Sequence, residues 1–155
     1  MTQPIPEGFH TLTPHIIVKD VAEAIAWYTK AFGAEEVLRL PAPDGSIMHA
    51  EIKIGNSVIM MAPANEQIQS KDPNMIGGTA VTLHIYSEDV DALYKQATEA
   101  GGNGTMPPED MFWGDRYAKL SDPWGHQWGI ATHIADPTPE EMEKAMQEMF
   151  SQQQS

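Results

Sequence analysis

The 155-residue chain contains no cysteine, few basic residues and no long apolar run. Without cysteine it has no disulfide, no zinc–thiolate site and no cysteine nucleophile. Lysine and arginine number 9 against 22 aspartate and glutamate residues, which gives a formal net charge of −13. Such a surface repels phosphate backbones and anionic lipid, so we expect no nucleic-acid or membrane partner. No apolar segment approaches the roughly 18 residues that a membrane span needs.

The N-terminus carries no recognisable targeting signal. It reads Met-Thr-Gln-Pro-Ile-Pro-Glu and has neither the basic start nor the apolar segment of a signal peptide. Together with the absence of cysteine, this favours a cytoplasmic location. At this length a single domain is the default expectation.

The sequence does contain an internal repeat. Residues 13–33 match residues 82–102 at 8 of 21 positions, at a constant offset of 69. In each copy a β-branched segment leads to a helix N-cap, Asp20 or Asp89, and an apolar stripe at helical spacing then ends at glycine. A long repeat that occurs only twice predicts a pair of packed modules and not a solenoid.

Each strand–helix unit is followed by further strand patterns separated by turns, of which Asp44-Gly45 is a strong hairpin signal. We therefore predict an α+β fold in a single domain, residues 1–155, built from two βαβββ modules. The first module covers residues 10–62 and the second covers residues 79–135. The connecting loop at 63–78 is long enough to fold over a site.

Residues 136–150 have no counterpart in the first half and predict a C-terminal amphipathic helix. Thr138 suits the N-cap and Glu141 completes a capping box. Met142, Met146 and Phe150 fall on one face of this helix. Burying each large apolar side chain yields roughly 1.5–3 kcal/mol, so we expect the helix to pack on its own domain or on a second subunit.

Five segments carry a family resemblance: WYTKAFG at 27–33, MHAE at 48–51, WGDR at 113–116, DPWGH at 122–126 and ATH at 131–133. With them, residues 10–142 resemble the vicinal oxygen chelate superfamily of glyoxalase I, bleomycin-resistance proteins and extradiol dioxygenases, and within it the PhnB-like branch. The resemblance implies that each module is a half-barrel and that the paired half-barrels enclose a central cavity. It also implies a homodimer.

Where members of that superfamily hold a divalent metal, the resemblance implies a ligand on the first strand and a glutamate on the last strand of each module. The first-strand positions carry Thr13 and Thr82, and the last-strand positions carry Ile59 or Met60 and Gly129. Divalent metals take imidazole, carboxylate or thiolate donors at such a site, and none of these residues offers one. We therefore expect no metal at the inherited site and no cofactor.

The cavity-facing positions carry polar and aromatic residues instead. If the inherited ligand positions face the cavity, strand alternation places histidines and a glutamate on the same faces. In the WGDR loop, the indole of Trp113 could close over a ligand and the guanidinium of Arg116 could bind an anionic group, or Asp115 and Arg116 could brace the loop. The candidate ligand-binding residues are His15, His49, Glu51, His84, Tyr86, Trp113 and Arg116.

Other conspicuous residues have a structural interpretation. Residues 122–126 predict a structural hairpin turn, and we place His10, His126 and His133 on the surface or in turns.

These observations predict a small-molecule binding protein of the glyoxalase and bleomycin-resistance type that lacks the usual metal ligands. We expect its ligand to carry an anionic or strongly polar group. The alternative is a glyoxalase-like lyase or isomerase that uses a relocated metal or His/Glu acid–base residues. A third possibility is an interaction protein whose terminal helix is the working surface. The sequence assigns a catalytic role to none of these residues.

Overall fold

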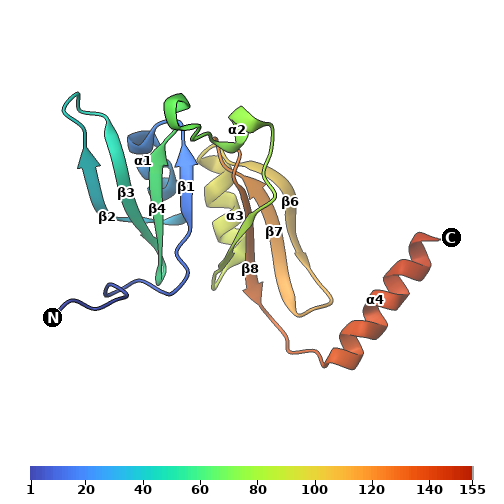
Figure 1. The fold of residues 1–155 in the computed structure, drawn as a ribbon. Helices are drawn as coiled ribbons and strands as arrows, with labels where there is room; N and C mark the ends of the chain where they lie inside the picture. Colours follow the sequence, from blue (N-terminus) through green and yellow to red (C-terminus); the bar gives the residue numbers. More distant parts are fainter. Residues whose placement is uncertain (155) are drawn as a thin grey trace.

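The computed structural model describes residues 1–154 and confirms the predicted fold class of two βαβββ modules followed by a helix (Figure 1). The first module forms one sheet of strand order β1-β4-β3-β2, in which β1 is parallel to β4 and the other pairs are antiparallel. Its elements are β1 (His15–Val18), α1 (Val21–Phe32), β2 (Glu35–Pro41), β3 (Ile47–Ile54) and β4 (Ser57–Pro63).

The second module repeats this arrangement with strand order β5-β8-β7-β6. Its elements are β5 (Thr82–Tyr86), α3 (Val90–Glu99), β6 (Asn103–Asp110), β7 (Asp115–Ser121) and β8 (Gln127–His133). The segment that joins the modules contains two short helical turns, η1 (Glu66–Ile68) and α2 (Pro73–Ile76).

Strand β6 continues through Pro107 and Pro108. It reaches Asp110 because Glu109 and Asp110 pair with Tyr117 and Arg116 of β7. The register shift between Met106 and Glu109 accommodates Pro107 and Pro108, which cannot donate a hydrogen bond to the ladder.

The repeated helix signals form as predicted. The side chains of Asp20 and Asp89 each accept a hydrogen bond of 3.0 Å from the backbone N–H three residues later. Gly33 ends α1 in the left-handed conformation at φ 68°, which glycine adopts without steric cost. The same local chemistry thus places a helix behind the first strand of both modules.

The core lies between these helices and one face of each sheet. In Figure 1, α1 and α3 lie behind the two sheets, and the strand residues that face them are fully buried: Ala50, Ile52, Met61, Leu120, Trp128 and Ile130. The two helices also contact each other, since the Gln96 amide of α3 donates to the backbone oxygen of Ala31 in α1 at 3.0 Å. The opposite face of each sheet is left open.

Asp122 ties the second sheet to α1. Its buried carboxylate accepts hydrogen bonds from the hydroxyl of Tyr28 and the indole N–H of Trp128, and also from the backbone N–H groups of Trp124 and His126. This confirms that residues 122–126 form a structural turn. His126 lies in that turn, as predicted, and its Nε2 lies 2.7 Å from the backbone oxygen of Ile17.

The C-terminal helix α4 (Pro139–Gln153) forms with the predicted Thr138 cap, which accepts from the N–H of Glu141 at 3.1 Å. None of its residues is buried, and it stands away from the body in Figure 1. Packing on its own domain, one of the two expected arrangements, is therefore not what the chain adopts. Neither α4 nor any other helix within residues 1–154 is long and apolar enough to cross a membrane.

Candidate functional site

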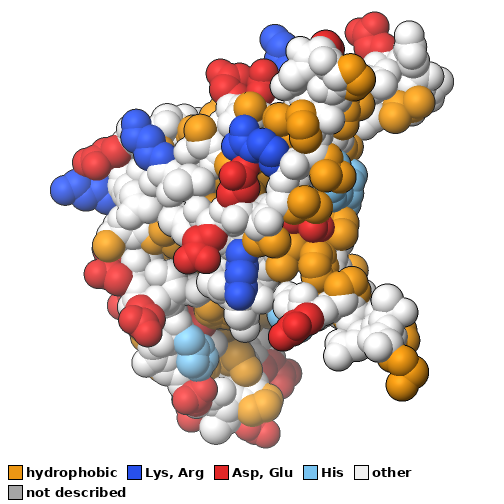
Figure 2. Space-filling model, turned by 90° about the vertical axis from the view of Figure 1, so that its left-hand side faces the viewer, with side chains coloured by type: hydrophobic (Ala, Val, Ile, Leu, Met, Phe, Trp, Pro, Cys, Tyr) orange, Lys and Arg blue, Asp and Glu red, His pale blue; other side chains and the backbone are white. Residues whose placement is uncertain are grey.

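The open face of the first sheet carries three of the predicted site residues. The strand register places His15 of β1, Met60 of β4 and Glu51 of β3 in one row, and His49 lies two residues before Glu51 on the same face. The rings of His15 and His49 are stacked, with centroids 6.1 Å apart and planes 24° apart. Figure 2 views the molecule from the side of β2 and therefore shows this face edge-on, with hydrophobic side chains and a histidine along its right-hand margin.

Glu51 is only 8% exposed although this face has no helix over it. Its carboxylate lies 3.7 Å from Nε2 of His49, which is too long for a hydrogen bond. Within residues 1–154, Glu51 accepts no hydrogen bond and has no closer ionic partner. This acceptor therefore faces the open side of the sheet without a donor.

The open face of the second sheet is lined by aromatic rings. His84 of β5 and Tyr117 of β7 are stacked at a centroid distance of 5.5 Å and an interplanar angle of 19°. Tyr86 meets His84 edge-on at 4.7 Å, and Trp113 meets Tyr117 edge-on at 5.9 Å. Tyr117 is not among the residues expected from the sequence, although strand alternation from Asp115 places it on the same face.

Asp115 holds this aromatic group together. It is 4% exposed, and its Oδ2 accepts from the hydroxyl of Tyr86 at 3.1 Å and from the indole N–H of Trp113 at 3.2 Å. Its Oδ1 lies 2.8 Å from Nδ1 of His133, whose Nε2 lies 2.7 Å from Oδ1 of Asp136. His133 is exposed, as predicted, yet carboxylates engage both of its ring nitrogens.

These contacts set the protonation of the group. Burial acts to raise the pKa of Asp115, but hydrogen bonds from His133, Tyr86 and Trp113 bring it below its ordinary value. Hydrogen bonds to Asp115 and Asp136 raise the pKa of His133, and the bond to Asp115 raises the pKa of Tyr86. Desolvation lowers the pKa of His84 against the opposing effect of the Asp115 charge. The face therefore favours a neutral imidazole at His84 and a cationic one at His133.

Arg116 lies on the opposite face of β7 from Asp115 and Tyr117. Its Nε lies 2.7 Å from Oδ2 of Asp91 in α3, and its Nη1 lies 2.9 Å from Oδ1 of Asp110 in β6. The guanidinium thus connects the helix to the sheet edge. The seven predicted residues separate accordingly: His15, His49 and Glu51 lie on one open face, His84, Tyr86 and Trp113 on the other, and Arg116 behind the second sheet.

A cavity of about 660 Å³ lies where the two modules meet. It lies between the segment before β1 and strand β5, and its wall includes Thr13, Pro14, His84, Tyr86 and Trp128. The two predicted residues His84 and Tyr86 therefore border a hollow that both modules form.

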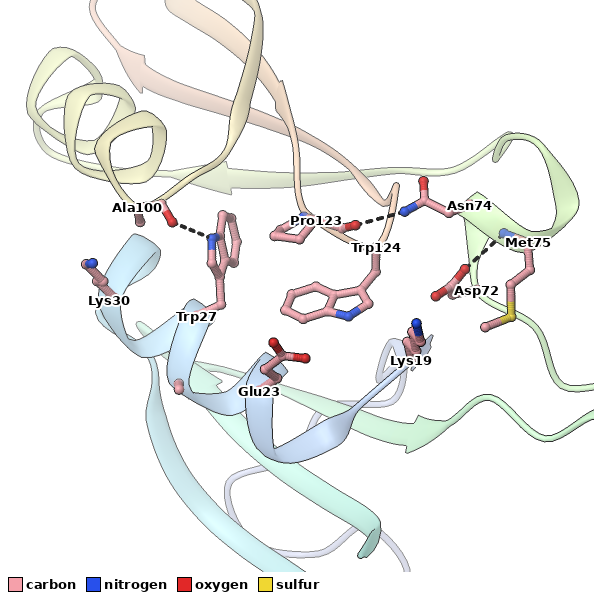
Figure 3. A pocket seen from close by; sticks show the side chains of 11 residues that line it. Lys19, Glu23, Trp27, Lys30, Asp72, Asn74, Met75, Ala100, Pro123 and Trp124 are labelled. Atoms are coloured by element: carbon pink, nitrogen blue, oxygen red, sulfur yellow. Dashed lines mark hydrogen bonds between the residues drawn. The ribbon is translucent and has the colours of Figure 1, made fainter.

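A second cavity of about 730 Å³ lies on the helix side of the molecule, between α1, α2 and the β7–β8 turn (Figure 3). The indole of Trp27 donates to the backbone oxygen of Ala100 at 2.9 Å, and the Asn74 amide donates to the backbone oxygen of Pro123 at 2.8 Å. Several of its polar groups thus serve the seam between the modules, and it contains none of the predicted site residues.

Residues 8–130 match the Glyoxalase/Bleomycin resistance protein/Dioxygenase superfamily. The chain belongs to this superfamily. An uncharacterized protein of Mycobacterium bovis is 39% identical over 138 residues, which cover 87% of this chain and 91% of that protein.

Two solved structures share the fold. TioX from Micromonospora sp. ML1 superposes with a TM-score of 0.65 at 28% identity, over 81% of this chain and 99% of that one. The PhnB protein of Bacillus cereus superposes with a TM-score of 0.59 at 18% identity, over 79% of this chain and 99% of that one, which shows a common fold alone.

The metal positions of the superfamily do not fit a metal in this member. Register pairs Gly129 with His84 as it pairs Met60 with His15, so Met60 and not Ile59 is the counterpart of Gly129. A Cβ atom at Gly129 would lie 2.8 Å from the hydroxyl oxygen of Tyr117 and 3.0 Å from Nδ1 of His84. The aromatic pair therefore fills the space that a glutamate would need. Among residues 1–154, no three His, Asp or Glu side chains are grouped to hold an ion.

Proposed function

We propose that this superfamily member, which we place in the PhnB-like branch, binds a small organic molecule on its open sheet faces without a metal ion. The observation that carries the proposal is the aromatic group around Asp115, whose buried carboxylate fixes Tyr86 and Trp113 by hydrogen bonds. Rings that are held in place before binding lose little entropy on contact with a ligand. Flat apolar surface beside a few polar groups is what small-molecule sites offer.

The occupation of the metal position by rings supports a metal-free mode of binding. Tyr117 and His84 stack over the backbone at Gly129. A flat ligand could extend this stack, since offset aromatic pairs gain about 0.5–1.5 kcal/mol beyond their area burial.

The indole N–H groups of the four tryptophans provide the test. Protein treated with EDTA would be titrated with a library of small aromatic fragments while the indole resonances are followed by NMR. We expect ligands to shift Trp113, to leave Trp27 and Trp124 on the helix side unchanged, and to bind more weakly to Tyr117→Ala.

The matched control is Arg116→Ala, which changes a residue behind the same strand and should leave fragment binding unchanged. Shifts confined to Trp27 and Trp124 would move the binding site to the cavity of Figure 3 and overturn the proposal.

We further propose that a homodimer completes the site. The two groups of site residues lie on separate sheets, and α4 extends from the body with Met146, Met149 and Phe150 about half exposed. Since α4 does not cover its own domain, a second copy is the partner that would bury its apolar stripe and cover the open faces.

Deletion of residues 137–155 tests the dimer. We expect the full chain to have twice the monomer mass by light scattering, and the shortened chain to have the monomer mass and a lower melting temperature. A shortened chain with unchanged mass and melting temperature would show that α4 makes no such contact. The control is Glu143→Gln on α4, which we expect to leave the mass unchanged.

One observation supports an enzymatic alternative of the glyoxalase type. His49 and Glu51 lie 3.7 Å apart on the open face, a pairing that could move a proton once a ligand closes the site. Turnover of a thiol hemithioacetal, with or without added Ni²⁺ or Zn²⁺, and its loss in Glu51→Gln, would favour this lyase or isomerase over a binding protein.

A further inference from the structure

Glu51 differs from every other buried acidic residue that the structure describes. Residues 1–154 contain four buried carboxylates, at Glu51, Asp72, Asp115 and Asp122. Asp72 accepts from the N–H of Met75 at 3.0 Å, and Asp115 and Asp122 each accept from several groups. Only Glu51 accepts no hydrogen bond within this part of the chain.

The carboxylate of Glu51 is accessible at the open face. Within residues 1–154 no fully buried side-chain oxygen or nitrogen lacks a hydrogen-bond partner, so the oxygens of Glu51, which accept no hydrogen bond, reach solvent. The neighbours of Glu51 in the register are Met60 on one side and Leu38 on the other, so apolar residues flank it. A charged donor makes the strongest hydrogen bond to a carboxylate. Because residues 1–154 supply no such donor, the carboxylate is suited to one that arrives at the open face.

The groups beside Glu51 indicate what carries that donor. His15 and His49 form a stacked pair next to it, which gives a flat surface on the same face. The nearest ring nitrogen, Nε2 of His49, lies 3.7 Å away and leaves the carboxylate available. Arg116, the residue expected to bind an anion, faces the other side of its own sheet and is held by Asp91 and Asp110.

We propose that Glu51 binds a cationic nitrogen of the ligand, an ammonium or amidinium group, attached to a flat ring that lies on the His15–His49 pair. This inference rests on the proposed function and replaces the expected anionic group by a cationic one. It makes Glu51 the residue that determines the charge of the accepted ligand.

Three probes of one shape test the charge: benzamidine, benzamide and benzoate. Binding would be measured by NMR from the imidazole resonances of His15 and His49 and from the indole of Trp113. We expect benzamidine to bind about tenfold or more tightly than benzamide, and benzoate to bind least, since a charge-assisted hydrogen bond is worth about that factor. Glu51→Gln should remove the preference.

The matched control is Glu99→Gln, which changes the net charge equally on the exposed surface of α3. An equal loss in both variants would assign the preference to the overall negative field and overturn the inference. Equal binding of the three probes, with Trp113 still shifted and Tyr117→Ala still weaker, would also overturn it while the proposed function stands. If no probe shifts the resonances of either face, both this inference and the proposed function are overturned. A changed dimer mass in Glu51→Gln without changed probe binding would assign the carboxylate to the subunit contact instead.

Discussion

His15, Met60 and Glu51 cross the first sheet in the same register in which His84, Gly129 and Lys119 cross the second. The histidine is common to both rows. Met60 in the first row corresponds to Gly129 in the second, and the carboxylate of Glu51 corresponds to the ammonium group of Lys119. Duplication has therefore kept the backbone register while the side chains have diverged to opposite charge. The two open faces cannot be interchangeable halves of one symmetric site.

The faces also differ in how their acids are supported. Asp115 is bonded to Tyr86, Trp113 and His133, whereas Glu51 has no hydrogen-bond donor within residues 1–154. A buried acceptor with several donors stabilises the native state. The oxygens of Glu51 instead reach solvent, since the same residues contain no fully buried side-chain oxygen without a partner. The second face is therefore held rigid by its acid, and the first face presents its carboxylate to the open side.

Isosteric amides at the two positions should separate these roles most clearly. Asp115→Asn replaces a carboxylate, which only accepts hydrogen bonds from its three donors, with an amide that both donates and accepts. We expect this change to lower the free energy of unfolding by about 1–3 kcal/mol. The Glu51 carboxylate accepts no hydrogen bond within residues 1–154 and reaches solvent, so we expect Glu51→Gln to leave the stability unchanged. Urea unfolding followed by far-UV circular dichroism gives both values.

The opposite order of stabilities would contradict this contrast between the two faces. If Glu51→Gln lowers the free energy of unfolding as much as Asp115→Asn does, Glu51 has a hydrogen-bond donor in solution. If that loss is the same above and below the protein concentration at which the dimer dissociates, the donor lies within the same chain. Unchanged stability in Asp115→Asn would show that the aromatic group stands without its carboxylate.

The fold was predictable because its signals are local and occur twice. Asp20 and Asp89 cap the two helices through bonds to residues three positions away, and Gly33 ends the first helix. Strand alternation was also sufficient to place His15, His49 and Glu51 on one face, since it depends only on the parity of neighbouring positions.

The site was less predictable because its decisive contacts are long-range or depend on one strand boundary. If residues 113–116 form a loop, the direction of the Arg116 side chain cannot be predicted. In the structure β7 begins at Asp115, so strand alternation points Arg116 to the helix side. The bond from Asp115 to His133 joins positions 18 residues apart across a hairpin. The amphipathic pattern of residues 136–150 shows that α4 has an apolar face but not which molecule covers it.

The smallest expected effect concerns the two histidines near Asp115, which should titrate in opposite directions. The pKa of His133 is raised by its bonds to Asp115 and Asp136, and the pKa of His84 is lowered by desolvation. NMR titration of the imidazole resonances should place His133 above and His84 below the unperturbed value of about 6.5. A coincident titration of both would show that Asp115 does not engage His133 in solution.

The same shifts fix the pH dependence of stability. For His133, whose folded pKa is raised, the stabilising contribution is fully present below about pH 6.5 and is lost as the pH rises through the folded pKa. For His84, whose folded pKa is lowered, stability is retained above about pH 6.5 and is lost as the pH falls through the folded pKa. Relative to the natural chain, His133→Gln should therefore lower the melting temperature most in acid and least in mild alkali, while His84→Gln should reduce the acid loss. His84→Gln leaves the Asp115–His133 contact in place and therefore controls for general destabilisation in acid. If His133→Gln lowers the melting temperature by the same amount from pH 5.5 to 9, the contact stabilises the fold through packing and not through charge.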